Sequence, residues 1–437
     1  MHSKKIHSPH RRVKVESRPS APPVLAPRTL AIDPASSIPS VTVRSLTFHP
    51  LLYRKRIAHC DAARPGDLVA VYGPEDVLMG YGLYNSRSEI AVRMVFPGVE
   101  LPTMDHWRHK LEVAVSLRCD LLHLDDAADA YRLVHAEADG LSGLVVDRYG
   151  DVLSAEAFSL GMYQRADALL AQLAPMCGAR HTLVRASPQF LSQEGYDPLP
   201  LASDGLPEQV TIREHGTRFR VRFAGGHKTG FFCDQRENRR RLAEFCGGRT
   251  VLDLCCYTGG FAVQAKKLGN AAEVTGVDLD EDPLQLAREN ANLNQVRIRF
   301  VQSDVFVYMR EMLQQGRQYD VVVLDPPKLI RNRAELEEGT RKHFDLNRLA
   351  MRLVRPGGVL LSCCCSGLLQ EADFLRLLCS ASYQAGPVTE AATAERSERH
   401  ASRPMQILAR TGAAADHPVA AGVPESEYLK AVWMRLG

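Results

Sequence analysis

Short apolar runs alternate with longer amphipathic stretches throughout the C-terminal half of the chain. The apolar runs predict strands at residues 250–254, 273–278, 297–302, 319–324 and 358–363. Helices are expected between them, at about residues 261–269, 283–293, 305–315 and 334–354. Strands that alternate with helices in this way are typical of a doubly wound, Rossmann-like α/β sheet. Two later apolar segments, 405–409 and 428–435, are expected to close its edge.

The N-terminal half has short strands and glycine-rich turns instead. In residues 41–105 this pattern predicts a small β-barrel. Residues 106–235 combine helical spacing with hairpin-like pairs of strands, so we expect a central α+β domain. This domain would link the barrel to the sheet domain of residues 236–437. Residues 1–40 are rich in Pro, Ser, Arg and His, which predicts a disordered basic tail.

Composition excludes several classes of protein. The sequence has no run of about eighteen apolar residues, so no transmembrane helix is expected, and its start has no apolar signal-peptide core. The eleven cysteines, several of them adjacent, do not resemble a disulfide framework and suit the reducing cytoplasm. A net charge of +3 is too small to indicate a nucleic-acid partner by itself.

The loop after the first strand of the sheet domain carries candidate chemistry. The strand contains Asp253 near its end, and the loop continues through Tyr257, Thr258, Gly259 and Gly260 into a helix. Ligands of open α/β sheets bind outside the carboxyl ends of the strands, where such loops gather. The loop lacks the Gly-x-Gly-x-x-Gly spacing of a dinucleotide site. It therefore favours a nucleoside cofactor without phosphates.

Two more carboxylates, Asp278 and Asp304, follow the next two strands. Each could simply cap the helix that comes after it. Three acids at consecutive strand ends, beside a glycine-rich loop, instead favour contacts to the ribose, adenine and amino groups of S-adenosylmethionine. Gln235 and Arg236, just before the sheet domain, are candidates to hold the carboxylate of this cofactor, the arginine by a bidentate pair.

The fourth strand ends in Asp325, followed by Pro326, Pro327 and Lys328. Prolines lack a backbone donor and have a locked φ, so they stop the strand and hold Asp325 rigidly at the carboxyl edge of the sheet. Tyr or Phe in place of Lys328 would indicate methylation of an exocyclic amine, with the ring stacked on the base. Lysine weakens that interpretation.

The fifth strand ends in three cysteines, of which Cys365 lies just past the strand and is a candidate nucleophile. Cytosine C5 becomes nucleophilic only after a thiolate has added to C6, so a cysteine beside a sulfonium cofactor is consistent with C5 methylation. Cys363 and Cys364 are expected inside the strand as small core residues. Three consecutive thiols cannot easily converge on one metal, and no partner Cys-x-x-Cys exists, so no metal is expected.

Taken together, these stretches resemble the bacterial large-subunit (23S) ribosomal RNA cytosine-5 methyltransferase family with an N-terminal PUA domain. The resemblance runs from about Val41 to the end of the chain. The stretches that carry it are Tyr131-Arg132-Leu133, Asp139-Gly140-Leu141, Gly143-Leu144, Asp147-Arg148, Gly226-His227-Lys228-Thr229-Gly230, Asp234-Gln235-Arg236, Tyr257-Thr258-Gly259-Gly260-Phe261, Asp325-Pro326-Pro327-Lys328, Cys365-Ser366-Gly367 and Ala415-Asp416-His417-Pro418. So many ordered matches are specific, although none would be alone.

The resemblance implies a PUA-like RNA-binding barrel, a central linking domain and a class I methyltransferase domain that uses S-adenosylmethionine. It implies that Cys365 attacks C6 while Asp325 hydrogen-bonds the base and assists protonation at N3. As in the resembled family, no second cysteine lies near Asp325, so the base for the elimination step is unassigned. The target base would have to leave its stack to reach the site.

Local basic groups supply the candidate RNA contacts, namely Lys328 and Arg331 after the proline pair and Arg54 and Lys55 in the barrel. The expected partner is large-subunit ribosomal RNA, with no membrane partner, and a homodimer is left open. Two alternatives stay open as well. One is a methyltransferase that acts on a guanine or adenine nitrogen, for which Cys365 is dispensable. The other is a catalytically silent RNA-binding assembly factor.

Overall fold

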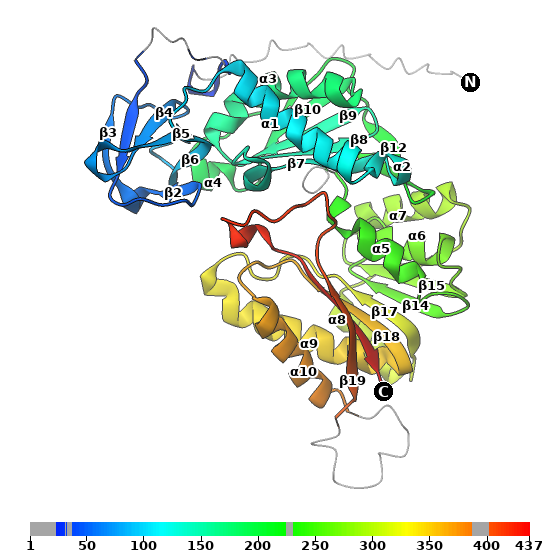
Figure 1. The fold of residues 1–437 in the computed structure, drawn as a ribbon. Coiled ribbons are helices and arrows are strands. Elements are labelled where there is room, and N and C mark those ends of the chain that lie inside the picture. Colours follow the sequence, from blue (N-terminus) through cyan, green and yellow to red (C-terminus); the bar gives the residue numbers. More distant parts are fainter. Residues whose placement is uncertain (1–22, 31, 33–36, 224–229, 387–401) are drawn as a thin grey trace, which may run out of the picture.

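The structure, a computed structural model, describes residues 23–30, 32, 37–223, 230–386 and 402–437. The strands of these residues form three sheets and one two-stranded hairpin. The two N-terminal sheets lie at the top of Figure 1, and the C-terminal sheet lies below them. The last part of the chain, drawn in red, runs from the C-terminal sheet up to the N-terminal ones and back (Figure 1).

The first sheet has six strands in the order β2-β6-β5-β4-β1-β3. Their bounds are β1 Ser40–Val43, β2 Leu51–Tyr53, β3 Ile57–Asp61, β4 Leu68–Tyr72, β5 Leu78–Tyr84 and β6 Ile90–Pro97. All neighbours pair antiparallel except β1 and β4, which are parallel. Inward residues such as Val41, Leu52, Val69 and Val92 form its core, as expected for alternating side chains on strands.

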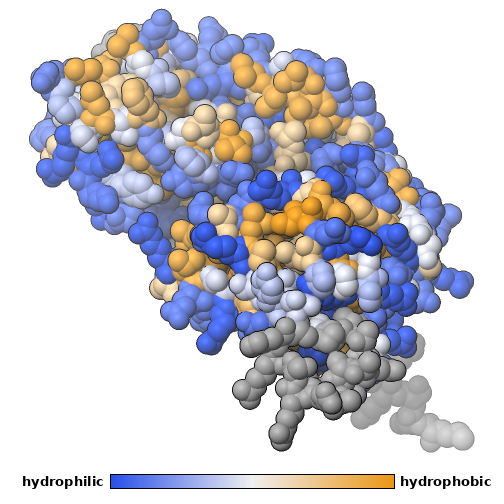
Figure 2. Space-filling view, turned by 60° about the horizontal axis from the view of Figure 1, so that its bottom comes forward, coloured by the Kyte–Doolittle hydropathy of each residue, from blue (hydrophilic) through white to orange (hydrophobic). Residues whose placement is uncertain are grey.

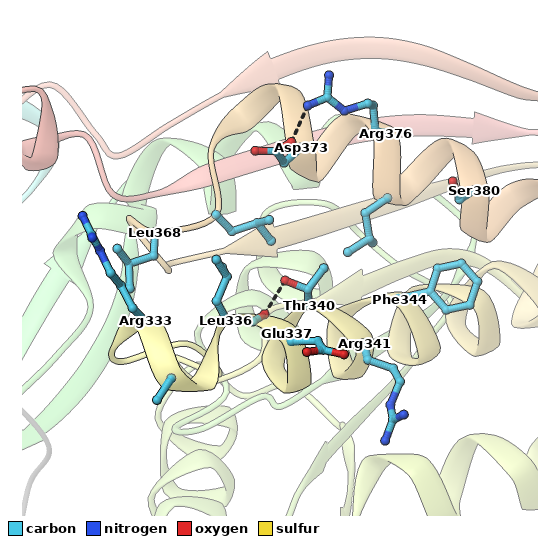
Figure 3. A pocket seen from close by; sticks show the side chains of 13 residues that line it. Arg333, Leu336, Glu337, Thr340, Arg341, Phe344, Leu368, Asp373, Arg376 and Ser380 are labelled. Carbon is cyan, nitrogen blue, oxygen red and sulfur yellow. Dashed lines mark hydrogen bonds and ion pairs between the residues drawn. The ribbon is translucent and has the colours of Figure 1, made fainter.

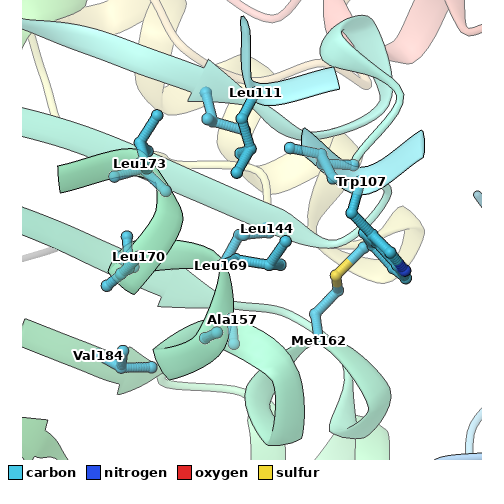
Figure 4. Close-up of a cluster of buried hydrophobic side chains, with 14 of the residues drawn as sticks. Trp107, Leu111, Leu144, Ala157, Met162, Leu169, Leu170, Leu173 and Val184 are labelled. Carbon is cyan, nitrogen blue, oxygen red and sulfur yellow. The ribbon is translucent and has the colours of Figure 1, made fainter. Parts of the chain in front are cut away.

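The second sheet has five strands in the order β11-β10-β9-β8-β7 and is packed against two long helices. The bounds are β7 Ala130–His135, β8 Leu144–Tyr149, β9 Val152–Ala157, β10 His181–Ala186, β11 Leu201–Ala202, α1 Met104–Ser116, α2 Leu124–Ala127, α3 Leu160–Cys177 and α4 Phe190–Glu194. Figure 4 shows Trp107 and Leu111 of α1 and Leu169 of α3 gathered with Leu144 and Ala157 of the sheet. This apolar layer fixes both helices to the sheet.

The third sheet has seven strands in the order β16-β15-β14-β17-β18-β20-β19. The bounds are β14 Thr250–Leu254, β15 Glu273–Asp278, β16 Arg299–Gln302, β17 Tyr319–Leu324, β18 Val354–Cys364, β19 Met405–Thr411 and β20 Lys430–Leu436. The first five strands pair parallel, whereas β20 runs antiparallel to β18 and β19. The predicted doubly wound α/β sheet, with two late strands at its edge, is thus confirmed.

Helices cover both faces of this sheet. Their bounds are α5 Arg236–Ala243, α6 Gly260–Lys267, α7 Glu281–Leu293, α8 Val305–Gln314, α9 Leu336–Leu353 and α10 Glu371–Tyr383. Leu252 and Leu324 pack with α8, α9 and α10, whereas their neighbours Val251 and Val323 pack with α5 and α6. This alternation follows from the period of two along a strand. The sequence predicted the helices between the parallel strands, but not α10.

The hairpin of β12 (Gln209–Glu214) and β13 (Thr217–Arg222) joins the central sheet to the C-terminal domain. Phe219 shares one apolar cluster with Tyr149 of β8 and Val263 of α6. Glu214 at the end of the hairpin forms a buried ion pair with Arg239 of α5, 2.6 Å long. The predicted domain boundary at residue 235 falls inside these shared contacts, and the boundaries stay predictions.

Part of the predicted tail is packed rather than disordered. Leu25 and Leu30 are 9% and 3% exposed and belong to the core of the central domain, and Trp107 Nε1 donates to the carbonyl of Leu30 at 3.1 Å. The prediction of disorder is therefore wrong for residues 23–30, because Leu25 and Leu30 are buried in the core and Arg28 forms an ion pair with Asp67. Residues 1–22 lie outside the described part of the chain.

The segment between β19 and β20, residues 412–429, is attached to α5 by a buried ion pair and to the central domain by two hydrogen bonds. The carboxylate of Asp416 accepts from both terminal nitrogens of Arg236, at 3.1 and 2.9 Å, and from the backbone N–H of Arg132 in β7, at 2.8 Å. Arg118 donates to the carbonyl of Asp416 at 2.8 Å. Burial by itself would raise the pKa of Asp416, but His417 and Arg236 hold it far below its ordinary value.

Replacing Asp416 by Asn should lower the free energy of unfolding by about 3–5 kcal/mol, because the buried guanidinium of Arg236 loses its buried counter-charge and keeps only the partly exposed Glu237. Urea titration followed by tryptophan fluorescence measures this change. The matched control, Asp373→Asn, removes an exposed pair with Arg376 and should cost less than about 1 kcal/mol. Equal losses for the two variants would contradict this account.

The same pair predicts how stability depends on pH. Since the pKa of Asp416 is depressed in the folded protein, the stabilisation is present above the unfolded Asp pKa of about 3.9 and is lost as the pH falls below it. In Asp416→Asn this acid loss should be smaller than in the wild type, as measured by urea titrations between neutral and acidic pH. An unchanged acid loss would contradict the assignment.

Candidate active site

The strand order reverses between β14 and β17, which are neighbours in the sheet although β15 and β16 separate them in the sequence. Ligands of doubly wound sheets bind at the carboxyl edge of such a switch point. Leu254, the last residue of β14, pairs with Val277 on one side and Leu324 on the other, and Leu324 pairs with Ser362. The predicted site residues after these strands therefore share one edge.

The loop after β14 has a strained backbone. Cys255 and Tyr257 adopt φ angles of 61° and 50°, a left-handed conformation that side chains rarely adopt, and Gly259 follows at 77°. Each such non-glycine residue costs on the order of 1–3 kcal/mol and tends to occur at ligand sites. The bent loop aims the N–H of Tyr257 at Asp278 Oδ2, 2.7 Å away, while Thr258 is buried and Gly260 starts α6.

Asp253 is the most buried of the three predicted cofactor-binding acids, at 1% exposure. Its Oδ2 accepts from the N–H of Ala262 in α6 at 2.9 Å. Its Oδ1 is buried and has no hydrogen-bond partner among the described residues. Burial raises the pKa of Asp253 well above its ordinary value, and the charges of Asp325 and Asp278 raise it further. A buried acceptor without a partner fits a ligand that brings a polar hydrogen to this edge.

The other two acids, Asp278 and Asp304, accept backbone hydrogen bonds and are less buried than Asp253. Asp278 is half-buried at the end of β15 and accepts from the N–H of Tyr257 and, at 3.2 Å, of Asp280. Asp304 is exposed, and its Oδ1 accepts from two N–H groups in the first turn of α8, at 2.9 and 3.1 Å. Asp278 thus presents a carboxylate at the loop edge, whereas Asp304 makes the helix cap weighed in the sequence analysis.

Gln235 and Arg236 do not form the expected pair of cofactor contacts. Arg236 is 1% exposed and bound to Asp416 through both terminal nitrogens, so it is not placed to hold a ligand carboxylate. Gln235 is 3% exposed, and its Nε2 donates to Asp325 Oδ2 at 3.0 Å. The sequence could not anticipate this, because Asp416 lies 180 residues further along the chain.

The three cysteines have different environments. Cys363 and Cys364 are fully buried inside β18, on opposite faces of the sheet. Burial raises the pKa of Cys363 well above its ordinary value, and the charge of Asp325 adds to the effect. Cys365 lies just past the strand and is half-buried. Of the three thiols, Cys365 is therefore the one placed to meet a substrate.

Two basic side chains lie near these cysteines. Lys430 is the strand partner of Cys364, and its Nζ donates to the carbonyl of Ser366 at 2.6 Å. Burial lowers the pKa of Lys430, and the thiols of Cys364 and Cys365 act in the opposite direction. Burial and the charge of Lys430 lower the pKa of His343 to about 4, so this imidazole is neutral at pH 7. The charge on Lys430 would favour a thiolate in its vicinity.

The predicted RNA contacts lie on two separate surfaces. Lys328 and Arg331 are exposed in the loop after Asp325, with Arg331 paired to Glu335 at 3.2 Å. Arg54 and Lys55 are exposed in the short 3-10 helix Arg54–Arg56 between β2 and β3, and Arg54 donates to the carbonyl of Arg87 at 2.7 Å.

A groove of about 810 Å³ lies between α9 and α10. Its apolar lining includes Leu336, Phe344 and Leu368, and Arg333 and Arg341 add positive charge (Figure 3). Leu368 follows Cys365 by three residues, and Arg333 follows the loop of Lys328, so the groove starts beside both candidate loops. Apolar patches framed by hydrophilic residues are also visible in the space-filling view (Figure 2).

Models of known families match two parts of the chain. Residues 39–95 match a PUA-like domain, and residues 191–387 match an S-adenosylmethionine-dependent methyltransferase domain. The first sheet thus belongs to the PUA-like domain and the third sheet to the methyltransferase domain. Both agree with the fold that the resemblance implied.

Similar proteins cover most of the chain. The ribosomal RNA large subunit methyltransferase I of Photobacterium profundum is 34% identical over 393 residues, which are 87% of this chain and 94% of its own. The chain belongs to the ribosomal RNA large subunit methyltransferase I family. Another member, from Aeromonas hydrophila, is 35% identical over 395 residues, 89% of this chain and 95% of its own. S-adenosylmethionine is the cofactor, as predicted.

Solved structures share the family's fold. A SAM-dependent methyltransferase from Streptococcus mutans gives a TM-score of 0.72 at 19% identity and covers 90% of this chain and 100% of its own. A methyltransferase complexed with SAH gives 0.72 at 20% identity, over 89% and 96%. At these identities the likeness supports the fold alone.

Two further predictions concern absences. No helix within the described ranges is long and apolar enough to cross a membrane. No group of three His, Cys, Asp or Glu side chains that could hold a metal occurs in the part of the chain that the structure describes. The homodimer and the cytoplasmic location stay predictions.

Three residues that hydrogen-bond around the site, Lys430, Asn238 and Thr411, were not predicted from the sequence. Lys430 interrupts the apolar run Leu429 to Val432, and a lysine inside a predicted strand was the signal that could have singled it out. Asn238 and Thr411 carried no such signal, because they bond to each other across 173 residues of the sequence.

Asp278→Ala should raise the dissociation constant for S-adenosylmethionine at least about tenfold, because hydrogen bonds to a charged group contribute about 1.5–3 kcal/mol each. Isothermal titration calorimetry measures the change. The control is Asp280→Ala, which removes the same charge two residues away and should alter binding by less than about twofold. Equal effects of both substitutions would remove Asp278 from the cofactor site.

Proposed function

We propose that this protein methylates C5 of a cytosine in large-subunit ribosomal RNA. The placement of Cys365 and Asp325 at one edge of the methyltransferase sheet carries the proposal. The family to which the chain belongs supports the substrate class, since its members are named for large-subunit ribosomal RNA. A silent RNA-binding factor would need neither a half-buried cysteine nor a rigidly held carboxyl group at the cofactor edge.

Cys365 and Asp325 would divide the covalent chemistry between them. The Cys365 thiolate forms a bond to C6, and Asp325 gives a proton to N3, so that C5 gains enamine character. Bound S-adenosylmethionine supplies the methyl group that C5 takes up. The C5 proton then leaves to a base, the bond from Cys365 to C6 breaks, and the N3 proton returns to Asp325. One proton is released per methyl group transferred.

The cofactor would be held at the loop after β14. Asp278 would accept from the ribose hydroxyls, and the unpartnered Oδ1 of Asp253 would accept from a polar hydrogen of the cofactor. Tyr257, Thr258, Gly259 and Gly260 would form the wall that the cofactor lies against, with the exposed Asp304 at its far end. Arg236 has no place in this set, because it is bound to Asp416.

RNA would be held by the basic residues on both sides of the site. Lys328 and Arg331 follow the loop of Asp325, where the phosphates of a nucleotide at Cys365 would pass. Arg54 and Lys55 of the PUA-like barrel would contact the backbone further along, which suits recognition of folded RNA by shape. The target base would be turned out of its stack.

The covalent step can be tested with RNA that carries 5-fluorocytosine, because fluorine at C5 blocks elimination. Wild-type protein with S-adenosylmethionine should form an adduct that survives a denaturing gel, and Cys365→Ala should form none. Cys379→Ala, which removes an exposed thiol on α10, should retain it. Methyl transfer without any adduct would sink the cytosine mechanism and favour transfer to a guanine or adenine nitrogen.

Lys328→Ala should weaken RNA binding and reduce the slope of log affinity against log salt by about one, since one phosphate contact is lost. Filter binding at several salt concentrations measures both quantities. Lys267→Ala at the end of α6, a lysine outside the proposed RNA surfaces, is the control and should leave the slope unchanged. A slope that Lys328→Ala does not alter would exclude Lys328 from the RNA surface.

A further inference from the structure

Gln235 ends a chain of hydrogen bonds that starts at Trp433. Trp433 Nε1 donates to Thr411 Oγ1 at 2.9 Å, and Thr411 Oγ1 donates to Asn238 Oδ1 at 2.7 Å. Asn238 Nδ2 donates to Gln235 Oε1 at 2.7 Å, and Gln235 Nε2 donates to Asp325 Oδ2 at 3.0 Å. This series of hydrogen bonds, the Gln235 relay, connects β20, β19 and α5 to the carboxyl group of Asp325.

Two groups outside the amides determine which atoms of the relay donate and which accept, the indole of Trp433 and the carbonyl of Gly412. The indole N–H of Trp433 can only donate, so Thr411 accepts there. The hydroxyl of Thr411 has two acceptors, Asn238 Oδ1 at 2.7 Å and the carbonyl of Ala431 at 3.4 Å, and the shorter contact favours Asn238. Asn238 Nδ2 also donates to the carbonyl of Gly412 at 3.1 Å, and a carbonyl can only accept. These two constraints orient the Asn238 amide, which in turn orients the Gln235 amide. Gln235 therefore presents a donor to Asp325.

Water has little access to these amides. Gln235 and Asn238 are 3% and 2% exposed, and Trp433 is fully buried. A buried amide that is bonded on both sides cannot turn without leaving polar atoms unpaired, which costs about 1–3 kcal/mol for each atom. The orientation in which Gln235 donates to Oδ2 of Asp325 is therefore the favoured one.

We propose that Gln235 is a positioning residue for methyl transfer, which it serves by confining the carboxyl proton of Asp325 to Oδ1. The inference rests on the proposed function, in which Asp325 exchanges a proton with N3 of the base. Because Oδ2 accepts from Gln235, the proton that moves to N3 when Cys365 bonds to C6 leaves from Oδ1. It returns to Oδ1 when that bond breaks.

The hydrogen bond from Gln235 also affects whether Asp325 is protonated. The groups that face this carboxyl group are Asp253 from β14, Cys255 from the loop after it, Cys363 and Cys364 from β18, and Gln235. The acid and the thiols disfavour a carboxylate once they are ionised, whereas the Gln235 donor favours it. Loss of the donor should therefore keep Asp325 protonated to higher pH.

The test is Asn238→Asp, an isosteric change one step behind Gln235. The new carboxylate cannot donate to Gln235 Oε1, so the Gln235 amide should turn and offer its oxygen to Asp325. We expect kcat to fall at least about tenfold, since general acid catalysis contributes roughly 10²–10⁴-fold. The alkaline limb of the kcat profile should move to higher pH. Binding of S-adenosylmethionine, measured by calorimetry, should change by less than about twofold.

Further variants separate positioning from folding. Thr411→Ser keeps the hydroxyl and should retain the wild-type kcat, whereas Thr411→Val removes it and should lower kcat. Gln235→Leu combined with Asn238→Asp should lose no more activity than Gln235→Leu alone, because both act through one contact. Thermal melting of each variant identifies any that fail to fold.

The outcomes distinguish this inference from the proposed function. A weaker affinity for S-adenosylmethionine in Asn238→Asp or Gln235→Leu would return Gln235 to the cofactor site and overturn the inference. An unchanged kcat and pH profile in Asn238→Asp would overturn it as well. Wild-type protein that transfers methyl groups to a nitrogen would instead overturn the proposed function, whatever the relay variants show.

Discussion

The arrangement of the domains depends on the buried Asp416, which forms an ion pair with Arg236 inside the methyltransferase domain. Asp416 also accepts from the backbone of β7, and Arg118 of the central domain donates to its carbonyl. The segment between β19 and β20 is thereby bound to two other parts of the chain at once. A buried pair of this kind contributes less to net stability than to specificity, because desolvation offsets most of the attraction. Its effect is to fix where α5 starts.

That position determines what surrounds the candidate active site. Asp234, Gln235 and Arg236 precede or begin α5, and the same segment of 412–429 reaches back to them, with Ala414 N–H donating to the Asp234 carbonyl at 2.8 Å. With Arg236 bound to Asp416, the neighbouring Gln235 points to Asp325. A carboxyl group that must hold and return a proton needs a fixed orientation as much as a suitable pKa. The structure supplies the orientation through Gln235 and through Asn238, which bonds to it.

Much of the methyltransferase domain was predictable, because parallel strands that are buried on both faces produce near-continuous apolar runs such as Val321 to Leu324. The sequence also located Cys365 and Asp325 at strand ends, since that needs only the end of each run. It assigned Arg236 to the cofactor and could not indicate the pairing with Asp416 that the structure shows, because this partner is 180 residues away. Pairings such as Gln235 with Asp325 depend on tertiary packing that no local pattern records.

Cytosine C5 is the methyl acceptor in the proposed mechanism, and the identity of the methylated nucleoside tests this most directly. Large-subunit ribosomal RNA would be incubated with the wild-type protein and isotope-labelled S-adenosylmethionine, digested to nucleosides and resolved by liquid chromatography with mass spectrometry. The account predicts that the label appears in 5-methylcytidine. Label in a methylated guanosine or adenosine would contradict it.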